Sequence, residues 1–220
     1  MMKQKILNAI PFCCETDFLN ISACSVEEQV LLREIMPSAK TVIVLAHHVK
    51  TFLEWAWFPL ESERNNNTCG ADLHSKNVLE TIGCALKEDG HTYCCVPYPG
   101  RCEIRMKDIA SRTALGQIGD NYMFLHSSWG PWTHLRLLLT DAVIASNSGS
   151  CADVCIHCGK CASVCPAQAI GADSFNGVAC GQYQGSQHNG IKDNYLWKCN
   201  KCAQVCPVGT PPSQIKITAV

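Results

Sequence analysis

Two spaced groups of cysteines between positions 155 and 206 restrict the possible folds and functions of this chain more than any other feature. The first group, Cys155 to Pro166, has the pattern CxxCxxCxxxCP. In proteins with two iron–sulfur clusters, three thiolates of this pattern bind one cubane and the fourth binds the other. The second group, Cys199 to Pro207, has the pattern CxxCxxxCP and carries Leu196 where a further cysteine is due. Cys180, the one cysteine between the groups, can take that place.

Crossed ligation between the two groups predicts two [4Fe–4S] clusters. The first cluster takes Cys155, Cys158, Cys161 and Cys206, and the second takes Cys165, Cys180, Cys199 and Cys202. Cys151 competes for a ligand place, but the regular triplet that starts at Cys155 is the better assignment. A zinc ribbon is the alternative, because paired CxxC units also suit tetrahedral zinc. Zinc sites do not need the CxxCxxCxxxCP run, which favours iron.

Nine further cysteines lack regular spacing. We interpret most of them as small buried hydrophobic residues, with metal binding by some of them as the alternative. They are Cys13, Cys14, Cys24, Cys69, Cys84, Cys94, Cys95, Cys102 and Cys151. The first residues do not have the form of a secretory signal peptide, so we expect a reducing cytoplasm rather than a disulfide framework. Oxygen attacks cluster thiolates, which favours an anaerobic setting.

Length and composition suggest two domains. The chain has 220 residues, of which 47% are hydrophobic, and about 150 residues precede the cysteine groups, enough for a core of their own. We therefore expect an α/β domain over residues 1–147 and a ferredoxin-like two-cluster domain over residues 148–220. A formal net charge of −1 offers no electrostatic attraction to nucleic acid or an anionic membrane. No apolar run reaches the ~20 residues that span a bilayer.

Local patterns predict the elements of the first domain. Ser25 and Glu28 form a capping box that begins a helix, and Pro37 ends it. The β-branched run 41–46 predicts a central strand covered on both faces. We expect further strands over 92–96 and 135–140 and helices over 72–88 and 109–115. Between them we expect an exposed loop over 61–68, a tight turn at Gly116 and Gly119 and a turn over 126–132. A linker over 146–150 should lead into the cysteine groups.

Two features could belong to a site in this domain. His47 and His48 follow the central strand at its carboxyl end, where α/β sheets tend to bind ligands. Adjacent residues on a strand point to opposite faces, so at least one of these histidines should be structural. The aromatic segment 52–58 fits a cofactor wall or a dimer interface, and a buried packing segment is the alternative.

The order of motifs resembles that of the epoxyqueuosine reductase and reductive dehalogenase superfamily. The shared features are the stretch LGQIGDN over 115–121, Gly130-Pro131, the run LLLTD over 137–141 and then the eight cysteines. The resemblance covers roughly residues 37 to 210 and is most specific from Ala114 onward. It implies an α+β fold, with a nitroreductase-like three-layer domain followed by the ferredoxin-like module.

The resemblance also implies a cobalamin or related corrinoid held beside the nearer cluster. Its contacts would come from Gly116, Gln117, Gly119, Asn121, Ser127, Ser128 and Trp129. Electrons would come from a low-potential donor such as ferredoxin or flavodoxin and pass through both clusters to the corrinoid. The acidic proton donor of epoxyqueuosine reductases is missing from the segment 96–103, and so is their tRNA-binding tail, so we do not expect queuosine synthesis. In its place, Tyr98 with Arg101 or Arg105 could supply a proton, as in dehalogenase-like chemistry.

These observations favour a corrinoid-dependent, reductase-like oxidoreductase that acts on a small molecule. The first alternative is a non-catalytic electron carrier or corrinoid-reducing partner whose first domain docks a protein, such as a corrinoid protein. The second is a cluster-bearing subunit whose catalytic site lies on another chain. A homodimer is compatible with all three.

Overall fold

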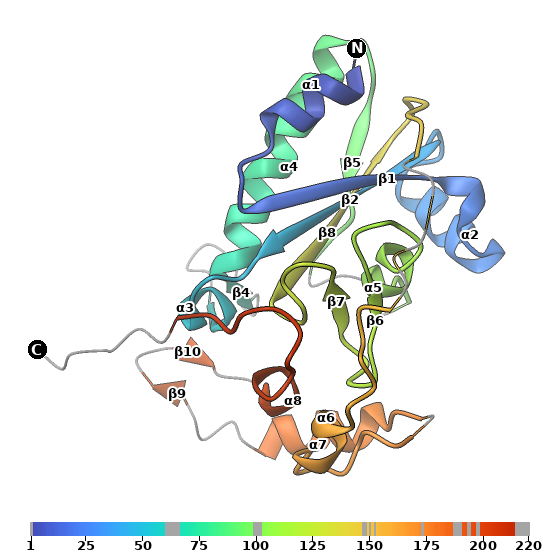
Figure 1. Cartoon of the computed structure of the whole chain (residues 1–220). Coiled ribbons are helices and arrows are strands. Elements are labelled where there is room, and N and C mark those ends of the chain that lie inside the picture. The colour runs from blue at the N-terminus through green and yellow to red at the C-terminus, as the bar shows by residue number, and fades with distance from the viewer. Residues whose placement is uncertain are drawn as a thin grey trace, which may run out of the picture.

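The structure is a computed structural model. It describes residues 2–59, 67–98, 103–146, 149, 151, 153–172, 174–186, 191–192, 195–196 and 199–213. Its centre is an antiparallel sheet of four strands in the order β1-β2-β8-β5 (Figure 1). The strands are β1 (Cys14–Asn20), β2 (Thr41–His48), β8 (Thr133–Thr140) and β5 (Tyr93–Cys95).

Helices cover both faces of this sheet. On one face α1 (Met2–Ala9) and α4 (Gly70–Glu88) enclose a core with Ile43, Leu45 and Leu138. On the other face α2 (Val26–Ile35) and α5 (Met106–Ala110) enclose a core with Val42 and Leu137. Because neighbouring residues of a strand point to opposite faces, a strand between two helical layers must be apolar on both sides.

The central strand and the first capped helix were predicted correctly. β2 pairs with β1 on one side and β8 on the other, and its residues from 41 to 47 are all buried. At the start of α2, the Glu28 amide donates to Ser25 Oγ at 3.2 Å, and Glu28 Oε2 accepts the Ser25 amide at 2.7 Å. This capping box satisfies two of the donors that a helix N-terminus leaves free.

The remaining strands and helices are short. A second sheet has the strand order β4-β3-β10-β9, and β6 pairs with β7 in a hairpin. The strands are β3 (Trp57–Pro59), β4 (Asn67–Cys69), β6 (Gly116–Ile118), β7 (Phe124–His126), β9 (Ile191–Lys192) and β10 (Tyr195–Leu196). The short helices are η1 (Ile21–Ala23), α3 (Phe52–Trp55), α6 (Lys160–Ser163), α7 (Gly177–Ser186) and α8 (Lys201–Gln204).

We call the described part of residues 148–220 the cysteine segment and the described part of residues 1–147 the first part of the chain. The cysteine segment lies against the first part of the chain, beside the β6–β7 hairpin (Figure 1). Strand β10, which holds Leu196, pairs with β3. His157 Nδ1 lies 2.8 Å from Asp120 Oδ1 in the turn that follows β6. The two predicted domains thus share a sheet and polar contacts. Of the predicted linker, residues 147, 148 and 150 lie outside the described residues.

The sequence misplaced the segment after α5. The expected helix over 109–115 ends at Ala110, and Gly116 lies in strand β6 rather than in a tight turn. The reason is a distant contact, because the Ala114 amide donates to Asp17 Oδ2 at 2.9 Å and so leaves the helical path. The turn itself comes later, where the Tyr122 amide donates to the Gly119 carbonyl. The expected loop over 61–68 falls mostly outside the described residues.

Most of the additional cysteines that the structure describes are at least partly buried, as predicted. Cys14, Cys24 and Cys69 are buried, Cys13, Cys94, Cys95 and Cys151 are half-buried, and Cys84 is exposed. Cys102 lies outside the described residues. Within the part of the chain that the structure describes, no helix has both the length and the apolar character to cross a bilayer.

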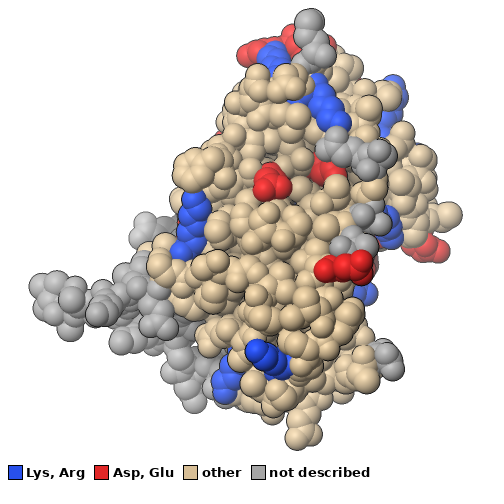
Figure 2. Space-filling model, viewed as in Figure 1, with Lys and Arg blue, Asp and Glu red and all other residues tan. Residues whose placement is uncertain are grey.

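Charged side chains are scattered over the face drawn in Figure 2, and neither sign forms a continuous patch there. This agrees with the formal net charge of −1. A face with such scattered charges gives no broad electrostatic attraction to a polyanion.

Replacing Gly130 by alanine should loosen the contact between the two parts of the chain. Gly130 has φ +59°, and a Cβ there would lie 2.0 Å from the Val208 carbonyl oxygen. We expect a loss of about 1–3 kcal/mol from backbone strain, with the clash in addition. The measurement is the urea midpoint of the cluster-loaded protein. Gly90→Ala is the control, since Gly90 has φ +82° with nothing within 4 Å. Equal losses in the two variants would show that the close approach to Val208 is unimportant.

Candidate cluster and cofactor site

A cavity of about 630 Å³ lies between the first part of the chain and the cysteine segment. We call it the main cavity. Its wall is largely apolar and aromatic, with Trp55, Trp57, Tyr98, Met123 and Phe124 among the contributors. Its volume falls within the range of about 300–1,000 Å³ that is typical of small-molecule and cofactor sites.

The two predicted ligand sets line two separate pockets. Cys165, Cys180, Cys199 and Cys202 lie in the wall of the main cavity. Cys155, Cys158, Cys161 and Cys206 line a smaller pocket of about 20 Å³. Asn121 borders both pockets. Cys151 is absent from the described lining of either pocket, and its amide donates to the Thr113 carbonyl at 3.3 Å.

Local structure holds these sulfur atoms in place. The loop through the first group turns sharply, with positive φ at His157, Gly159 and Gln168. Cys165 Sγ accepts the Ala169 amide at 3.3 Å, and Cys180 Sγ accepts Gln184 Nε2 at 3.3 Å. Hydrogen bonds to cluster sulfurs are among the factors that set a cluster's reduction potential.

Within the second set, Cys202 has an environment that disfavours its thiolate. Cys202 Sγ lies 3.9 Å from Met123 Sδ, and burial raises the pKa of the Cys202 thiol to about 11. A metal bound at Cys202 would have to offset the cost of making this thiolate, and metal binding would then be coupled to the folding of the segment.

A buried polar cluster borders the main cavity at the start of β8. Asp72 on α4 accepts hydrogen bonds from Arg136 Nη1, from His134 Nε2 at 3.1 Å and from Thr68 Oγ1 at 3.2 Å. His134 lies in the cavity wall beside Tyr98, with ring centroids 4.8 Å apart in an edge-on arrangement. The Arg136 guanidinium carbon lies 5.4 Å from the centre of the Tyr98 ring.

Charge within this cluster is divided between Asp72 and Arg136. Burial alone would raise the pKa of Asp72, but the hydrogen bond from His134 and the charge and hydrogen bond of Arg136 lower it. Burial lowers the pKa of His134 in spite of its bond to Asp72. We therefore assign an ionised carboxylate to Asp72, a guanidinium to Arg136 and a neutral imidazole to His134. Burial also raises the pKa of Tyr98, so its phenol stays protonated at neutral pH.

The structure places Tyr98, the predicted proton donor, in the cavity wall. Arg101 lies outside the described residues, and Arg105 forms an ion pair with Asp108 at 3.0 Å. The cation near the Tyr98 ring is Arg136, which the sequence reading missed. A signal was available, because His134 and Arg136 alternate with leucines in a strand whose other residues are leucine and threonine.

The predicted corrinoid contacts do not gather in one place. Of the seven residues, Asn121 lies in the wall of the main cavity. Gly116 and Gly119 lie inside the β6–β7 hairpin, where an added Cβ would meet Leu125 at 2.0 and 2.4 Å. Gln117 lies in β6, and Ser127 and Ser128 are exposed. The Trp129 ring stacks on the rings of His126 and His48, with centroid distances of 3.8 and 5.0 Å.

The aromatic segment after β2 packs partly against the core and partly lines the main cavity. Phe52 and Trp55 pack edge-on against the buried Trp132, at 5.7 and 5.4 Å. Trp55 and Trp57 also line the main cavity.

Comparisons with known proteins identify the cluster segment and the fold. Residues 154–210 match the family model of the 4Fe-4S dicluster domain. A selenomethionine-labelled epoxyqueuosine reductase is similar with a TM-score of 0.70 and 18% identity, over 94% of this chain and 65% of that chain. The epoxyqueuosine reductase from Streptococcus thermophilus gives 0.66 and 17%, over 96% and 66%. The chain has the fold of the epoxyqueuosine reductases.

Reductive dehalogenases have a related structure. The catabolic reductive dehalogenase NpRdhA matches with a TM-score of 0.58 and 15% identity, over 80% of this chain and 26% of that chain. The resemblance inferred from the sequence motifs is thus confirmed, as a likeness of fold. This chain spans just under two thirds of the length of the epoxyqueuosine reductases that it matches. A comparison with the sequences of curated proteins finds no match.

Replacing Asp72 by asparagine should destabilise this epoxyqueuosine reductase-like fold by about 3–5 kcal/mol, because it leaves the Arg136 guanidinium buried without its counter-charge. The measurement is the urea midpoint at pH 7. Asp141→Asn, near the surface, is the control and should cost less than about 1 kcal/mol. The Asp72 pKa is depressed, so its contribution is present above the unfolded value of about 3.9 and is lost as pH falls through the folded pKa. A difference between wild type and variant that grows below pH 4 would contradict this assignment.

Proposed function

We propose that this chain is an oxidoreductase in which two [4Fe–4S] clusters pass electrons to a corrinoid held in the main cavity, for reductive chemistry on a small molecule. One observation carries the proposal. Cys165, Cys180, Cys199 and Cys202 lie in the wall of that cavity. A cluster on these four thiolates would touch whatever the cavity holds.

The crossed ligand assignment gives the electrons a short route. Cys155, Cys158, Cys161 and Cys206 would hold the outer cluster, at the smaller pocket, and Asn121 would stand between it and the inner cluster. Clusters of this type can reach potentials near or below about −400 mV. We propose ferredoxin or flavodoxin as the donor, in a reducing, anaerobic cytoplasm. The covered faces of the sheet support a nitroreductase-like three-layer domain over residues 1–147 and a two-cluster module over residues 148–220.

The wall of the main cavity suits a corrinoid. It offers flat aromatic surfaces at Trp57 and Tyr98 together with the polar group of Asn121, beside the second set of cysteines. When bound, a corrinoid supplies a strongly reducing and nucleophilic cobalt centre. The chain's own residues would exclude water, place the substrate and deliver a proton.

Tyr98 is the proposed proton source at the cavity. Its phenol stays protonated because burial raises its pKa. Arg136 lies over its ring, 5.4 Å from the centroid, and would favour the phenolate once the proton has left. Asp72 holds Arg136 and His134 in place and acts as a positioning residue. General acid catalysis of this kind typically contributes about 10²–10⁴-fold to a rate.

We expect Tyr98→Phe to keep cluster and cobalamin content but to lower reductive turnover about 10²-fold or more. The assay offers a panel of small epoxides and organohalides, with a low-potential reductant, to anaerobic protein purified with cobalamin present. Tyr93→Phe is the matched control, because Tyr93 packs in the core on the α4 face and not in the described wall of the cavity. Equal turnover in wild type and Tyr98→Phe would remove Tyr98 from the mechanism. Cluster-loaded protein without bound cobalamin would favour the electron-carrier alternative.

A further inference from the structure

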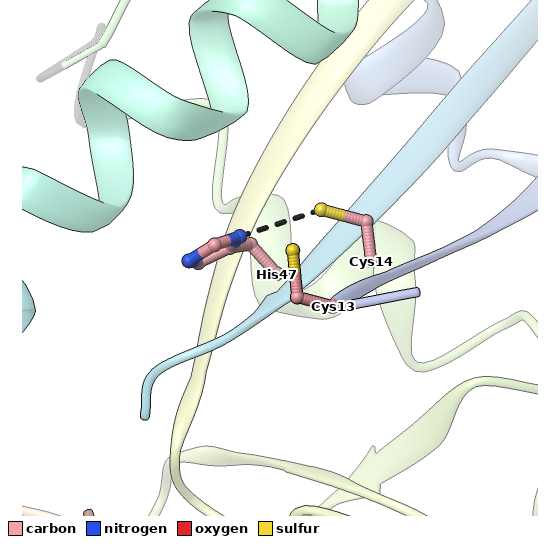
Figure 3. Close-up of side chains that lie close together, drawn as sticks. All are labelled: Cys13, Cys14 and His47. Carbon is pink, nitrogen blue, oxygen red and sulfur yellow. Dashed lines mark hydrogen bonds between the residues drawn. The ribbon is translucent and has the colours of Figure 1, made fainter. Parts of the chain in front are cut away.

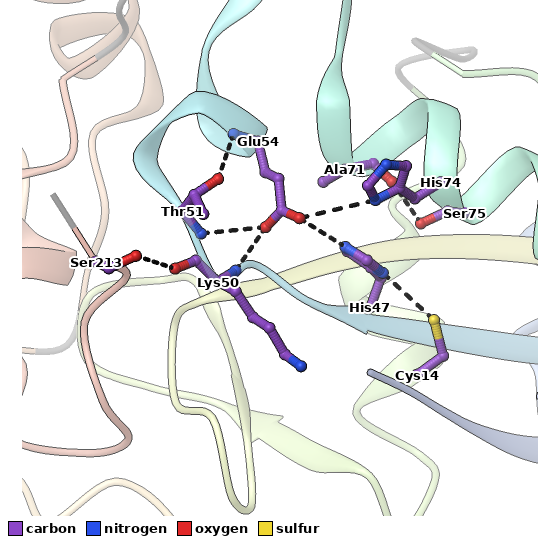
Figure 4. Close-up of polar contacts among 9 residues, drawn as sticks. All are labelled: Cys14, His47, Lys50, Thr51, Glu54, Ala71, His74, Ser75 and Ser213. Carbon is purple, nitrogen blue, oxygen red and sulfur yellow. Dashed lines mark hydrogen bonds and ion pairs between the residues drawn. The ribbon is translucent and has the colours of Figure 1, made fainter. Parts of the chain in front are cut away.

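Glu54 divides its two carboxylate oxygens between a helix cap and two histidines (Figure 4). Oε2 accepts the amides of Lys50 at 2.6 Å and Thr51 at 3.2 Å, which caps α3 and fixes the side chain. Oε1 lies 3.9 Å from His47 Nε2 and 3.7 Å from His74 Nδ1. The three side chains come from β2, α3 and α4; β2 and α3 follow one another in the chain, whereas α4 begins at Gly70.

His47 has one satisfied and one unsatisfied nitrogen. Its side chain is 2% exposed, and Nδ1 lies 3.3 Å from Cys14 Sγ, next to Cys13 (Figure 3). On the opposite side of the ring, Nε2 is buried and lacks a hydrogen-bond partner among the residues that the structure describes. A buried polar atom without a partner costs stability and calls for an explanation. The position of Nε2, aimed at Glu54 and His74, offers one.

We propose that His47 Nε2, Glu54 Oε1 and His74 Nδ1 bind a divalent transition metal ion of the Zn²⁺ class. The three atoms lie within 4.8 Å of one another. With zinc bonds of about 2.0–2.2 Å, tetrahedral geometry places neighbouring ligand atoms roughly 3.3–3.6 Å apart. The observed separations of 3.7 and 3.9 Å need to contract by only a few tenths of an ångström.

The site has an entrance and a fixed inner wall. The His74 side chain is 61% exposed, so a metal ion can reach the site from solvent and a water can complete its shell. Two imidazoles, one carboxylate and an open position form the ligand set of several catalytic zinc sites. Cys14 at Nδ1 orients the His47 ring, as partners of metal-bound histidines commonly do.

The same side chains could attract one another without a metal, as an ion pair. Burial would raise the pKa of Glu54, but His47 and the amides of Lys50 and Thr51 lower it to about 2, so the carboxylate is ionised in either case. A hydrogen-bonded ion pair would bring a histidine N–H closer to Oε1, and 3.9 Å is too long for a hydrogen bond. The separation suits an ion placed between the groups.

A metal here would tie the main cavity's wall to the central sheet. Glu54 belongs to that wall, while His47 is the last residue but one of β2 and His74 lies in the second turn of α4. The inference is independent of the corrinoid and stands if that proposal fails. It concerns residues outside both predicted cluster sets.

The test is Zn²⁺ uptake by the anaerobic full chain with both clusters loaded. We expect about one Zn²⁺ per chain with iron content unchanged, and zinc-edge X-ray absorption with N/O ligands at about 2.0–2.2 Å and no sulfur near 2.3 Å. At about 100-fold excess over Kd, the thermal midpoint should rise by about 5–10 °C. His74→Ala, an exposed change, and Glu54→Gln should each weaken uptake about 100-fold. His91→Ala, at another partly exposed histidine, should leave it unchanged.

Each of the following results would overturn the proposal. Equal uptake by wild type and His74→Ala would show that zinc binds elsewhere. An all-sulfur shell would place it in a cluster site, and a mixed sulfur and nitrogen shell would assign it to Cys13, Cys14 and His47 Nδ1. Failure of cluster-loaded wild type to take up zinc would leave the ion pair as the explanation.

Discussion

Cys180→Ser should remove one cluster and keep the other, so that the protein retains about four of about eight irons per chain. Cys180 lies in α7, its sulfur accepts Gln184 Nε2 at 3.3 Å, and it shares the wall of the main cavity with Cys165, Cys199 and Cys202. Serine keeps the size of the side chain but is a poor ligand for iron. Iron and sulfide analysis after anaerobic purification, with EPR of the reduced protein, measures the loss.

Cys151→Ser is the matched control and should keep both clusters. Cys151 is half-buried, and its backbone amide, which the change leaves in place, bonds to Thr113. Loss of a cluster in Cys151→Ser together with retention in Cys180→Ser would overturn the ligand assignment. Stoichiometric zinc in place of iron would overturn the cluster proposal as a whole.

Ala167→Trp should weaken cobalamin binding by about 100-fold while leaving both clusters in place. Ala167 is half-buried in the wall of the main cavity, two residues from Cys165. An indole at this position would occupy space that the proposal gives to the corrinoid. Equilibrium dialysis of cluster-loaded protein against cobalamin measures the affinity.

The control for this variant is Val178→Trp. Val178 is 69% exposed and lies outside the described lining of the main cavity. The substitution therefore adds the same indole to the cysteine segment without entering the cavity. It should bind cobalamin as wild type does. If Ala167→Trp also bound cobalamin normally, with its iron intact, the corrinoid would have to lie outside the main cavity.

The sequence predicted those parts of the fold that local patterns determine. The run 41–46 is apolar at successive positions, and it forms the central strand β2. Ser25 and Glu28 lie three residues apart and cap α2 as expected. The segment after Ala110 was predicted wrongly because its path depends on Asp17, which lies 97 residues away from Ala114 in the sequence. Sequence patterns carry little information about such contacts.

In the candidate site too, local patterns could be predicted from the sequence and long-range contacts could not. The spacing of the two groups, together with Cys180 as the one cysteine between them, was enough to propose eight cluster ligands and to divide them into two sets. Tyr98 was also named in advance, but its neighbours Arg136 and Asp72 were not, because 64 residues separate these two in the chain. His47 was named as a possible site residue, but Glu54 and His74 were not, because His74 comes from α4, which only the fold brings beside the other two.

The central claim is that a corrinoid binds beside the inner cluster, and EPR tests it most directly. Cluster-loaded protein is titrated anaerobically with cob(II)alamin and partly reduced, so that cobalt and cluster are paramagnetic together. We predict saturable binding with a base-off spectrum, and faster relaxation of the cobalt signal from the nearby cluster. This effect should disappear in Cys180→Ser. A cobalt spectrum identical to that of free cob(II)alamin, in protein that carries both clusters, would contradict the account.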